Sequence, residues 1–224
     1  MRTKALLLTA ALGLAGAATS MAQAVYSVNV VGYINLTMKP GFNLVANQLN
    51  ASPNNKLDTV LPAAALASEL LKFSNNNFTS AISDGANWID PATGDPSPLT
   101  VSPGEGFFFF NPDATDAMVT LVGEVKTGSS TVTLIPGFNM ISTVVPQDLS
   151  LTAANGFPQV LAAEFLTFNA SSQTYNPGLI HDGSQWIDAA TGDPVDAKPG
   201  VGQAFFYFNP ETTVSWTRSF NPNN

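Results

Sequence analysis

Residues 38–47 read MKPGFNLVAN, and residues 134–143 read LIPGFNMIST. The offset is 134 − 38 = 96 positions. Repetition at a nearly constant offset predicts a tandem duplication, which we place at residues 25–125 and 126–224. Three other segments recur at offsets of 95 to 98, namely ELLKF with EFLTF (69–73, 164–168), DGANWIDPATGDP with DGSQWIDAATGDP (84–96, 182–194) and FFFFNP with FFYFNP (107–112, 205–210).

Each copy carries mainly signals for β structure. Short runs rich in Val, Ile, Phe, Tyr and Thr alternate with Pro-Gly, Asn-rich and Asn-Pro turns. This pattern predicts an all-β protein built from two tandem antiparallel β-sandwich or open-barrel modules. One short helix per repeat is compatible with it, and in the first copy LPAAALASELL (61–71) is the candidate, with Pro62 as a first helical residue.

The Pro-Gly-Phe-Asn motif is interpreted as architecture. Pro40 and Gly41 suit a turn, because proline fixes φ and glycine accepts a positive φ. In the strand that follows, Phe42 and Leu44 share the inward face. Asn43 falls on the other face, where its amide can satisfy a neighbouring backbone group or water.

The first residues have the pattern of a secretory signal peptide. Arg2 and Lys4 precede an uncharged apolar run over residues 5–18, and Ala-Gln-Ala follows at 22–24. The run is shorter than the roughly 20 apolar residues that cross a bilayer. We therefore expect residues 1–24 to be removed and the mature chain to be exported, to the extracellular space, the cell surface or the periplasm, without inserting into a membrane.

Charge and cysteine content narrow the function classes. The chain has 8 basic and 16 acidic residues, so without Arg2 and Lys4 the formal charge is 6 − 16 = −10. A surface of this charge repels nucleic acid. The absence of cysteine from the sequence excludes disulfides, so the fold has to rest on apolar burial.

Several of these segments together resemble a group of exported bacterial proteins. The resemblance is carried by VYSVNVVGYIN (25–35), PGFNLVANQLN (40–50), LLKFSNNNFTS (70–80), SPGEGFFFFNP (102–112) and VTLVGEV (119–125). The group has twin modules with Gly-(Phe/Trp)-Asn-Leu-(Ile/Val), an aromatic hairpin and Pro-Gly-x-Gly-Phe-Phe. The resemblance implies an exported β-rich module and assigns no catalytic residues. The second copy departs from the pattern, since PGVGQAFFYFNP (199–210) has two extra residues before its aromatic run.

The aromatic strands are the first candidate interface. Alternation sends Phe107 and Phe109 to one face and Phe108 and Phe110 to the other. Only one pair can fill the module's own core, and the other presents roughly 300 to 500 Å². The cover is the short helix, the sister module, a second subunit or a ligand. The corresponding residues of the second copy are Phe206 and Phe208.

The Trp-Ile-Asp segments are the second candidate. Trp88 and Trp186 lie among carboxylates, an arrangement that suits a carbohydrate platform. The same carboxylates are weak calcium candidates, although their spacing departs from the familiar calcium loop. A structural interpretation is that the tryptophans pack inward while the aspartates accept backbone hydrogen bonds in turns. The carboxylates are Asp84, Asp90, Asp95, Asp182, Asp188 and Asp193.

Catalytic patterns are sparse. There is no cysteine nucleophile, and the single histidine, His181, corresponds to Ser83 in the first copy. Paired carboxylates of the glycosidase type are available only from scattered acids such as Asp84, Asp90 and Glu105. We therefore expect a non-enzymatic protein without a cofactor.

We expect the protein to act by binding to other macromolecules or to copies of itself. Structural, adhesive or self-assembly roles fit best, with a second copy or a cell-surface polymer as the partner. The alternatives are carbohydrate binding through Trp88 and Trp186, and a secreted hydrolase.

Overall fold

The computed structural model describes residues 30–62 and 65–222, so the predicted signal peptide lies outside the described residues. Strands hold 46% of the residues and helices 4%, in several antiparallel sheets, which confirms the prediction of an all-β fold. The first repeat contains β1 (Val31–Met38), β2 (Gly41–Asn47), α2 (Leu57–Val60), β3 (Glu69–Ser74), β4 (Asn77–Ser83), β5 (Trp88–Ile89), β6 (Glu105–Asn111) and β7 (Ala117–Glu124).

The second repeat follows after the short connection 125–127. Its elements are β8 (Gly128–Leu134), β9 (Gly137–Ile141), the 3-10 helix η2 (Ala153–Asn155), β10 (Glu164–Leu166), β11 (Phe168–Asn169), β12 (Thr174–Tyr175), β13 (Leu179–His181), β14 (Trp186–Asp188), β15 (Phe205–Asn209) and β16 (Val214–Phe220). No helix within the described ranges is long and apolar enough to cross a membrane.

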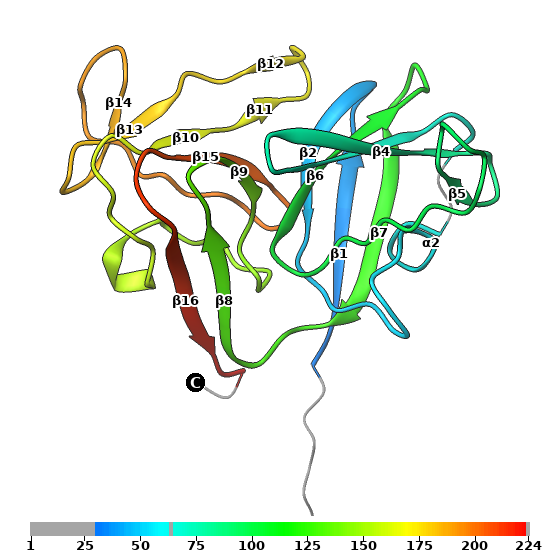
Figure 1. The fold of residues 1–224 in the computed structure, drawn as a ribbon, viewed down its shortest axis with the longest axis horizontal. Coiled ribbons are helices and arrows are strands. Elements are labelled where there is room, and N and C mark those ends of the chain that lie inside the picture. Colours follow the sequence, from blue (N-terminus) through cyan, green and yellow to red (C-terminus); the bar gives the residue numbers. More distant parts are fainter. Residues whose placement is uncertain (1–29, 63–64, 223–224) are drawn as a thin grey trace, which may run out of the picture.

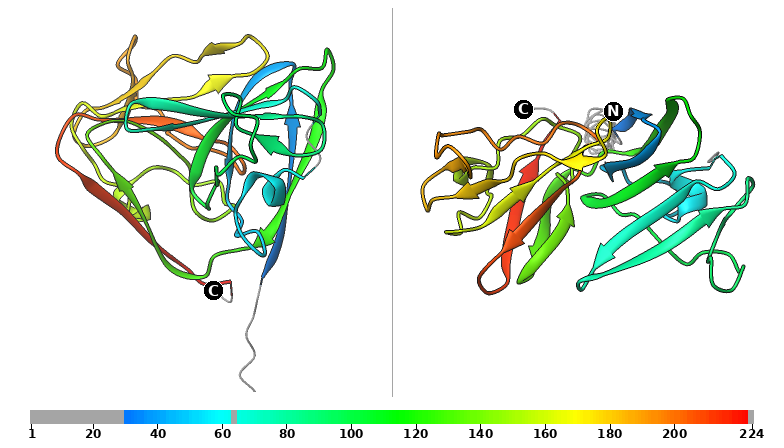
Figure 2. Two further views of the ribbon diagram at one scale, coloured as in Figure 1. Left: turned by 45° about the vertical axis from the view of Figure 1, so that its right-hand side comes forward. Right: turned by 90° about the horizontal axis from the view of Figure 1, so that it is seen from above.

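One antiparallel sheet runs through both repeats (Figure 1). Its order is β14-β13-β10-β15-β9-β6-β3-β4-β5, and β2 pairs with β6 beside this path. Two ribbons, β1–β7 and β8–β16, each cover one half of this central sheet. Figure 2 shows the two halves side by side, each with its own ribbon.

Each half has its own core between ribbon and sheet. In the first repeat, Leu121 of the ribbon and Phe107 and Phe109 of β6 belong to one buried cluster. In the second, Phe205 and Tyr207 of β15 occupy the corresponding positions. Alternation along β6 and β15 therefore sends these residues into the cores, and their neighbours Phe108 and Phe206 to the opposite face of the central sheet.

In the described part of the segment 61–71, namely 61–62 and 65–71, the expected helix is not found. The helix is a single turn at Leu57–Val60, and Glu69–Leu71 belong to β3. Leu70 is fully buried, and β3 pairs with β6 from Glu69 to Leu71. Long-range pairing thus overrides the helix propensity of the alanine-rich segment.

The two Pro-Gly-Phe-Asn motifs form the same clasp. The Asn43 Nδ2 donates to the C=O groups of Lys39 (2.8 Å) and Gly41 (3.0 Å), and its Oδ1 accepts from the Lys39 N–H (2.7 Å). Asn139 makes the equivalent bonds to Ile135 and Gly137 at 2.8 to 3.0 Å. Each asparagine therefore closes the tight turn that joins the ribbon to the central sheet.

The repeats meet about a pseudo-two-fold axis. The Ala46 N–H donates to the Gly202 C=O at 2.9 Å, and the Ser142 N–H donates to the Gly104 C=O at 2.9 Å. Ala46 and Ser142 are 142 − 46 = 96 positions apart, and Gly104 and Gly202 are 202 − 104 = 98 apart, which match the repeat offsets. The contact therefore has the form of an isologous dimer interface made within one chain.

Candidate binding surface

A continuous aromatic face lies on the side of the central sheet opposite the ribbons. Its buried centre contains Leu44, Phe108, Met140 and Phe206, with half-buried aromatics around it. The ring contacts obey the pseudo-two-fold symmetry, because Phe73 of the first repeat packs on Phe206 (5.5 Å) and Phe168 of the second packs on Phe108 (5.2 Å). Both pairs are T-shaped, which is a favoured ring geometry. Each repeat thus covers part of the other's aromatic strand.

The rim of this aromatic face remains accessible. Phe78 and Tyr175 are each 49% exposed, and Phe138 is 38% exposed. An apolar pocket of about 210 Å³ opens beside Phe78 and is lined by Phe42, Leu71, Phe78, Phe108 and Phe168. The surface therefore offers rings from both repeats around a shallow apolar hollow.

The four predicted interface phenylalanines divide into two classes. Phe108 and Phe206 are only 7% and 6% exposed and contact each other with a centroid distance of 6.2 Å. Phe110 and Phe208 are half-buried and pack on Phe42 and Phe138, each at 5.0 Å. The sister repeat is therefore the main cover of Phe108 and Phe206, whereas Phe110 and Phe208 pack on rings of their own repeats.

The interpretation of Trp88 and Trp186 as carbohydrate platforms is wrong. Their exposed fractions are 2% and 4%. The Trp88 Nε1 donates to the Leu61 C=O (3.0 Å), and the Trp186 Nε1 donates to the Leu151 C=O (2.9 Å). Both indoles are thus bonded inside their repeat cores and present no ring face to a sugar.

The calcium candidates act as turn caps. The Asp84 carboxylate accepts from the N–H groups of Ala86 and Asn87, and the Asp182 carboxylate accepts from those of Ser184 and Gln185, at 2.7 to 2.8 Å. These bonds lower the pKa of Asp84, and they lower that of Asp182 to about 2. Asp90 and Asp188 cap the next turns in the same way, while the N–H groups of Asp95 and Asp193 donate to the hydroxyl oxygens of Thr93 and Thr191.

Glu105, one of the acids considered for a glycosidase-type pair, makes an ion pair. Glu105 bonds to the Lys72 ammonium (2.8 Å) and to the Ser102 N–H (2.6 Å). Within residues 30–62 and 65–222, no group of three or more His, Asp or Glu side chains gathers in metal-binding geometry. Glu105 therefore positions the loop before β6.

His181 is buried and holds a turn. Its Nε2 lies 2.9 Å from Gln159 Oε1, and its Nδ1 accepts from the Gly183 N–H (3.1 Å), which fixes the neutral ring with the proton on Nε2. Ser83, its counterpart, accepts from the Gly85 N–H at the same 3.1 Å. Burial lowers the pKa of His181, and the negative charge of Asp182, which raises this pKa, has the smaller effect.

We expect stability to fall as the pH drops below 6.5, the ordinary pKa of histidine. The unfolded chain then binds a proton that the folded chain binds only at lower pH, so the free energy of unfolding decreases by at most about 1.4 kcal/mol per pH unit. His181→Ser, which copies the first repeat, should remove this slope between pH 7 and 5. Urea unfolding across that range measures it. An unchanged slope in the variant would assign the pH dependence to other groups.

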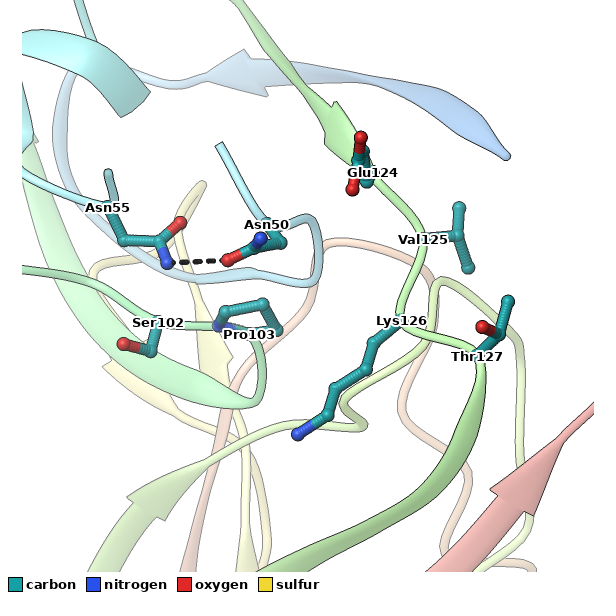
Figure 3. A pocket seen from close by; sticks show the side chains of 8 residues that line it. All are labelled: Asn50, Asn55, Ser102, Pro103, Glu124, Val125, Lys126 and Thr127. Carbon is teal, nitrogen blue, oxygen red and sulfur yellow. Dashed lines mark hydrogen bonds between the residues drawn. The ribbon is translucent and has the colours of Figure 1, made fainter. Parts of the chain in front are cut away.

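A groove between the repeats was not predicted from the sequence. It has a volume of about 390 Å³ and is lined by four segments, at 72–75 in and after β3, 102–106 before and in β6, 131–133 and 135 in and after β8, and 138–141 of β9. Ser102 and Pro103 also line a neighbouring polar hollow of about 500 Å³ (Figure 3).

Comparison with known proteins adds no relative. No family model, curated protein or solved structure matches the chain.

Proposed function

We propose that this chain is an exported, non-enzymatic contact protein that self-associates, with the aromatic face supplying the apolar part of the contact. The observation that carries the proposal is the rim of half-exposed rings, Phe78, Phe138 and Tyr175, with an apolar pocket beside Phe78. Exposed aromatic rings are enriched at protein interfaces. The signal-peptide pattern and the low charge content support action outside the cytoplasm.

A second copy is the partner that suits this face. The aromatic face has the pseudo-two-fold symmetry of the whole chain, so two copies can pair with each repeat making the same contacts. Taking about 200 Å² as the full area of such a side chain, the three rim residues expose roughly 270 Å². A stable interface buries about 800 Å² per partner. The aromatic rim therefore gives a weak contact that needs a further element.

Replacing the rim rings should weaken association. We expect Phe78→Ser combined with Tyr175→Ser to raise the dissociation constant of self-association at least tenfold, because each exposed ring loses its apolar contact. Sedimentation velocity over a concentration series of the chain without residues 1–24 measures the change.

Tyr33→Ser is the matched control. Tyr33 is 70% exposed, but it lies on the outer face of the β1–β7 ribbon, away from the aromatic face. Its replacement should leave association unchanged. A loss with Tyr33→Ser and none with the rim variant would place the contact on the ribbon, and a chain that stays monomeric at every concentration would refute self-association.

A further inference from the structure

One edge of β9 is available for pairing. The N–H and C=O groups of an antiparallel strand point to alternate sides in successive residues. Just after β9, the Ser142 N–H donates to the Gly104 C=O, away from β15 and toward the first repeat. The N–H and C=O of Phe138, four residues earlier, point to that same side. They face the groove between the repeats, which Phe138 lines.

The equivalent edge of β2 is occupied by a side-chain amide. The Gln173 Oε1 accepts from the Phe42 N–H (2.8 Å), and its Nε2 donates to the Phe42 C=O (3.0 Å). The carboxamide thus bonds the strand edge as the peptide group of an added strand does. Gln173 also approaches Gly41 so closely that a Cβ there would lie 2.7 Å from its Oε1.

The edge of β9 lacks such a cap because the hairpin of the first repeat, which lies beside it, is shorter. The segment between Phe73 and Phe78 is SNNN, four residues, whereas the segment between Phe168 and Tyr175 is NASSQT, six residues that include Gln173. The shorter turn approaches β9, with Asn76 Oδ1 3.6 Å from the position of a Cβ on Gly137. No hydrogen bond from this turn to Phe138 is found among the described residues. The duplication therefore leaves one of two equivalent edges open.

The groove beside this edge has two different sides. Phe73 and Phe138 belong to the aromatic face of the central sheet. Thr131 and Thr133 are exposed residues of β8, in the ribbon on the opposite side of that sheet. A strand added to β9 would place alternate side chains against rings on one side and hydroxyls on the other. The volume of about 390 Å³ lies within the range of ligand sites.

We propose that this groove binds residues 25–29 of a second copy as an added β-strand. The segment reads VYSVN, so Tyr26 and Val28 share one face and Ser27 and Asn29 the other, which matches the aromatic and hydroxyl sides of the groove. It carries no charge, and five extended residues span about 17 Å. The inference rests on the proposed self-association, because it names the element that adds to the weak aromatic contact.

The donor belongs to another copy because of where the segment ends. Residue 29 precedes Val30, whose C=O accepts from the Val125 N–H (2.7 Å) at the start of β1. Figure 1 shows the start of β1 at the lower end of its ribbon and β9 in the upper part of the other repeat. Reciprocal donation between two copies closes a dimer, which agrees with the two-fold pairing of the aromatic faces, and donation from one chain to the next generates rings or open chains of copies.

Deletion of the segment tests the proposal. The chain without residues 1–24 should form multimers, and the chain that starts at Val30 should shift at least tenfold toward monomer in sedimentation velocity. The synthetic peptide VYSVNV should bind the shorter chain with one site by calorimetry. A peptide with Ser27→Pro, which loses an N–H and cannot pair as a central strand, should bind at least tenfold more weakly.

Two variants assign the peptide to the β9 edge. Replacing Ser74–Asn77 with Asn-Ala-Ser-Ser-Gln-Thr copies the second hairpin, so its glutamine should cap Phe138 and abolish peptide binding. Gln173→Ala uncaps β2 and should raise the stoichiometry from one site to two. Hydrogen exchange of the free chain should be fast at the Phe138 amide and slow at the Phe42 amide, and the peptide should slow exchange at Phe138.

The outcomes separate the two proposals. A chain that remains monomeric with residues 25–29 present refutes self-association itself. Association that is equal with and without residues 25–29, or peptide binding that survives the hairpin replacement, refutes only the strand-addition site. Peptide binding with one site, lost in the hairpin replacement, supports it.

Discussion

Phe206→Ala is expected to lower the free energy of unfolding by about 3 to 5 kcal/mol, the usual cost of removing a buried phenylalanine ring. Phe206 is 6% exposed and lies in the cluster that joins the two repeats. Its ring contacts those of Phe73, Phe108 and Phe138 at 5.5 to 6.2 Å. Because those rings come from both repeats, the repeats cannot close around the cavity without giving up other ring contacts.

Phe108→Ala should cost a similar amount, and the double variant should not be additive. Phe108 and Phe206 contact each other across the pseudo-two-fold axis, so removing one already removes part of what the other contributes. We expect a coupling of 0.5 kcal/mol or more in a double-mutant cycle. Urea unfolding followed by tryptophan fluorescence reports on both cores, since Trp88 and Trp186 are buried in different repeats.

Phe110→Ala is the matched control in the same strand. Its ring is half-buried and contacts that of Phe42. We expect a loss of about 1 to 2 kcal/mol, in proportion to the smaller area that it buries. Equal losses for Phe108→Ala and Phe110→Ala would show that the inter-repeat cluster is not a special source of stability. The exposed rings Phe78 and Tyr175 are therefore the better positions for testing association, because they lie at the edge of this cluster and their replacement leaves its buried rings in place.

The sequence correctly predicts the features of the fold that depend on neighbouring residues in one strand. Alternation alone separates Phe107 and Phe109, which enter the core, from Phe108 and Phe110, which do not. It cannot tell what covers Phe108, because the cover comes from Phe168 and Phe206 in the other repeat through pairing over long sequence distances. Several covers of Phe108 are compatible with the sequence. The pairing of β6 with β9, which places the two repeats in one sheet, identifies the sister repeat as the cover.

Two predictions from the sequence were wrong because contacts between residues far apart in the sequence decide the structure there. Trp88 between aspartates has the composition of a sugar site, but its indole bonds to Leu61 and lies inside the core, a placement that depends on the whole fold. The alanine-rich segment before β3 favours a helix locally, yet Leu70 is needed as a buried strand residue. The sequence contains one sign of the groove at Phe138, because the hairpin of the first repeat is two residues shorter than that of the second. This difference can be interpreted only once the structure shows that Gln173 of the longer hairpin bonds to the edge of β2.

Asn139→Ala is expected to destabilise the fold by about 3 kcal/mol. The amide is 7% exposed and serves the Ile135 N–H and the C=O groups of Ile135 and Gly137. Alanine leaves these backbone groups without a partner, and each buried unsatisfied group costs about 1 to 3 kcal/mol. Water that enters the vacated space offsets part of this sum. Thermal and urea unfolding measure the loss.

Asn43→Ala should give nearly the same loss, because its clasp has the same partners one repeat earlier. The control is Asn77→Ala, an exposed asparagine whose amide makes a single bond of 3.3 Å to the Asn75 C=O, and this change should stay within about 0.5 kcal/mol.

Aspartate at position 139 separates the two roles of the amide. Asn139→Asp keeps an acceptor for the Ile135 N–H but turns a carboxylate oxygen toward the C=O groups of Ile135 and Gly137. We therefore expect a loss at least as large as that of alanine at pH 7, and recovery as the pH falls and the carboxyl group gains a proton to donate. A neutral effect of both substitutions would mean that the turn geometry is held by Pro136 and Gly137 alone. A large loss in both explains why Pro-Gly-Phe-Asn is retained in both copies while the residues after it differ.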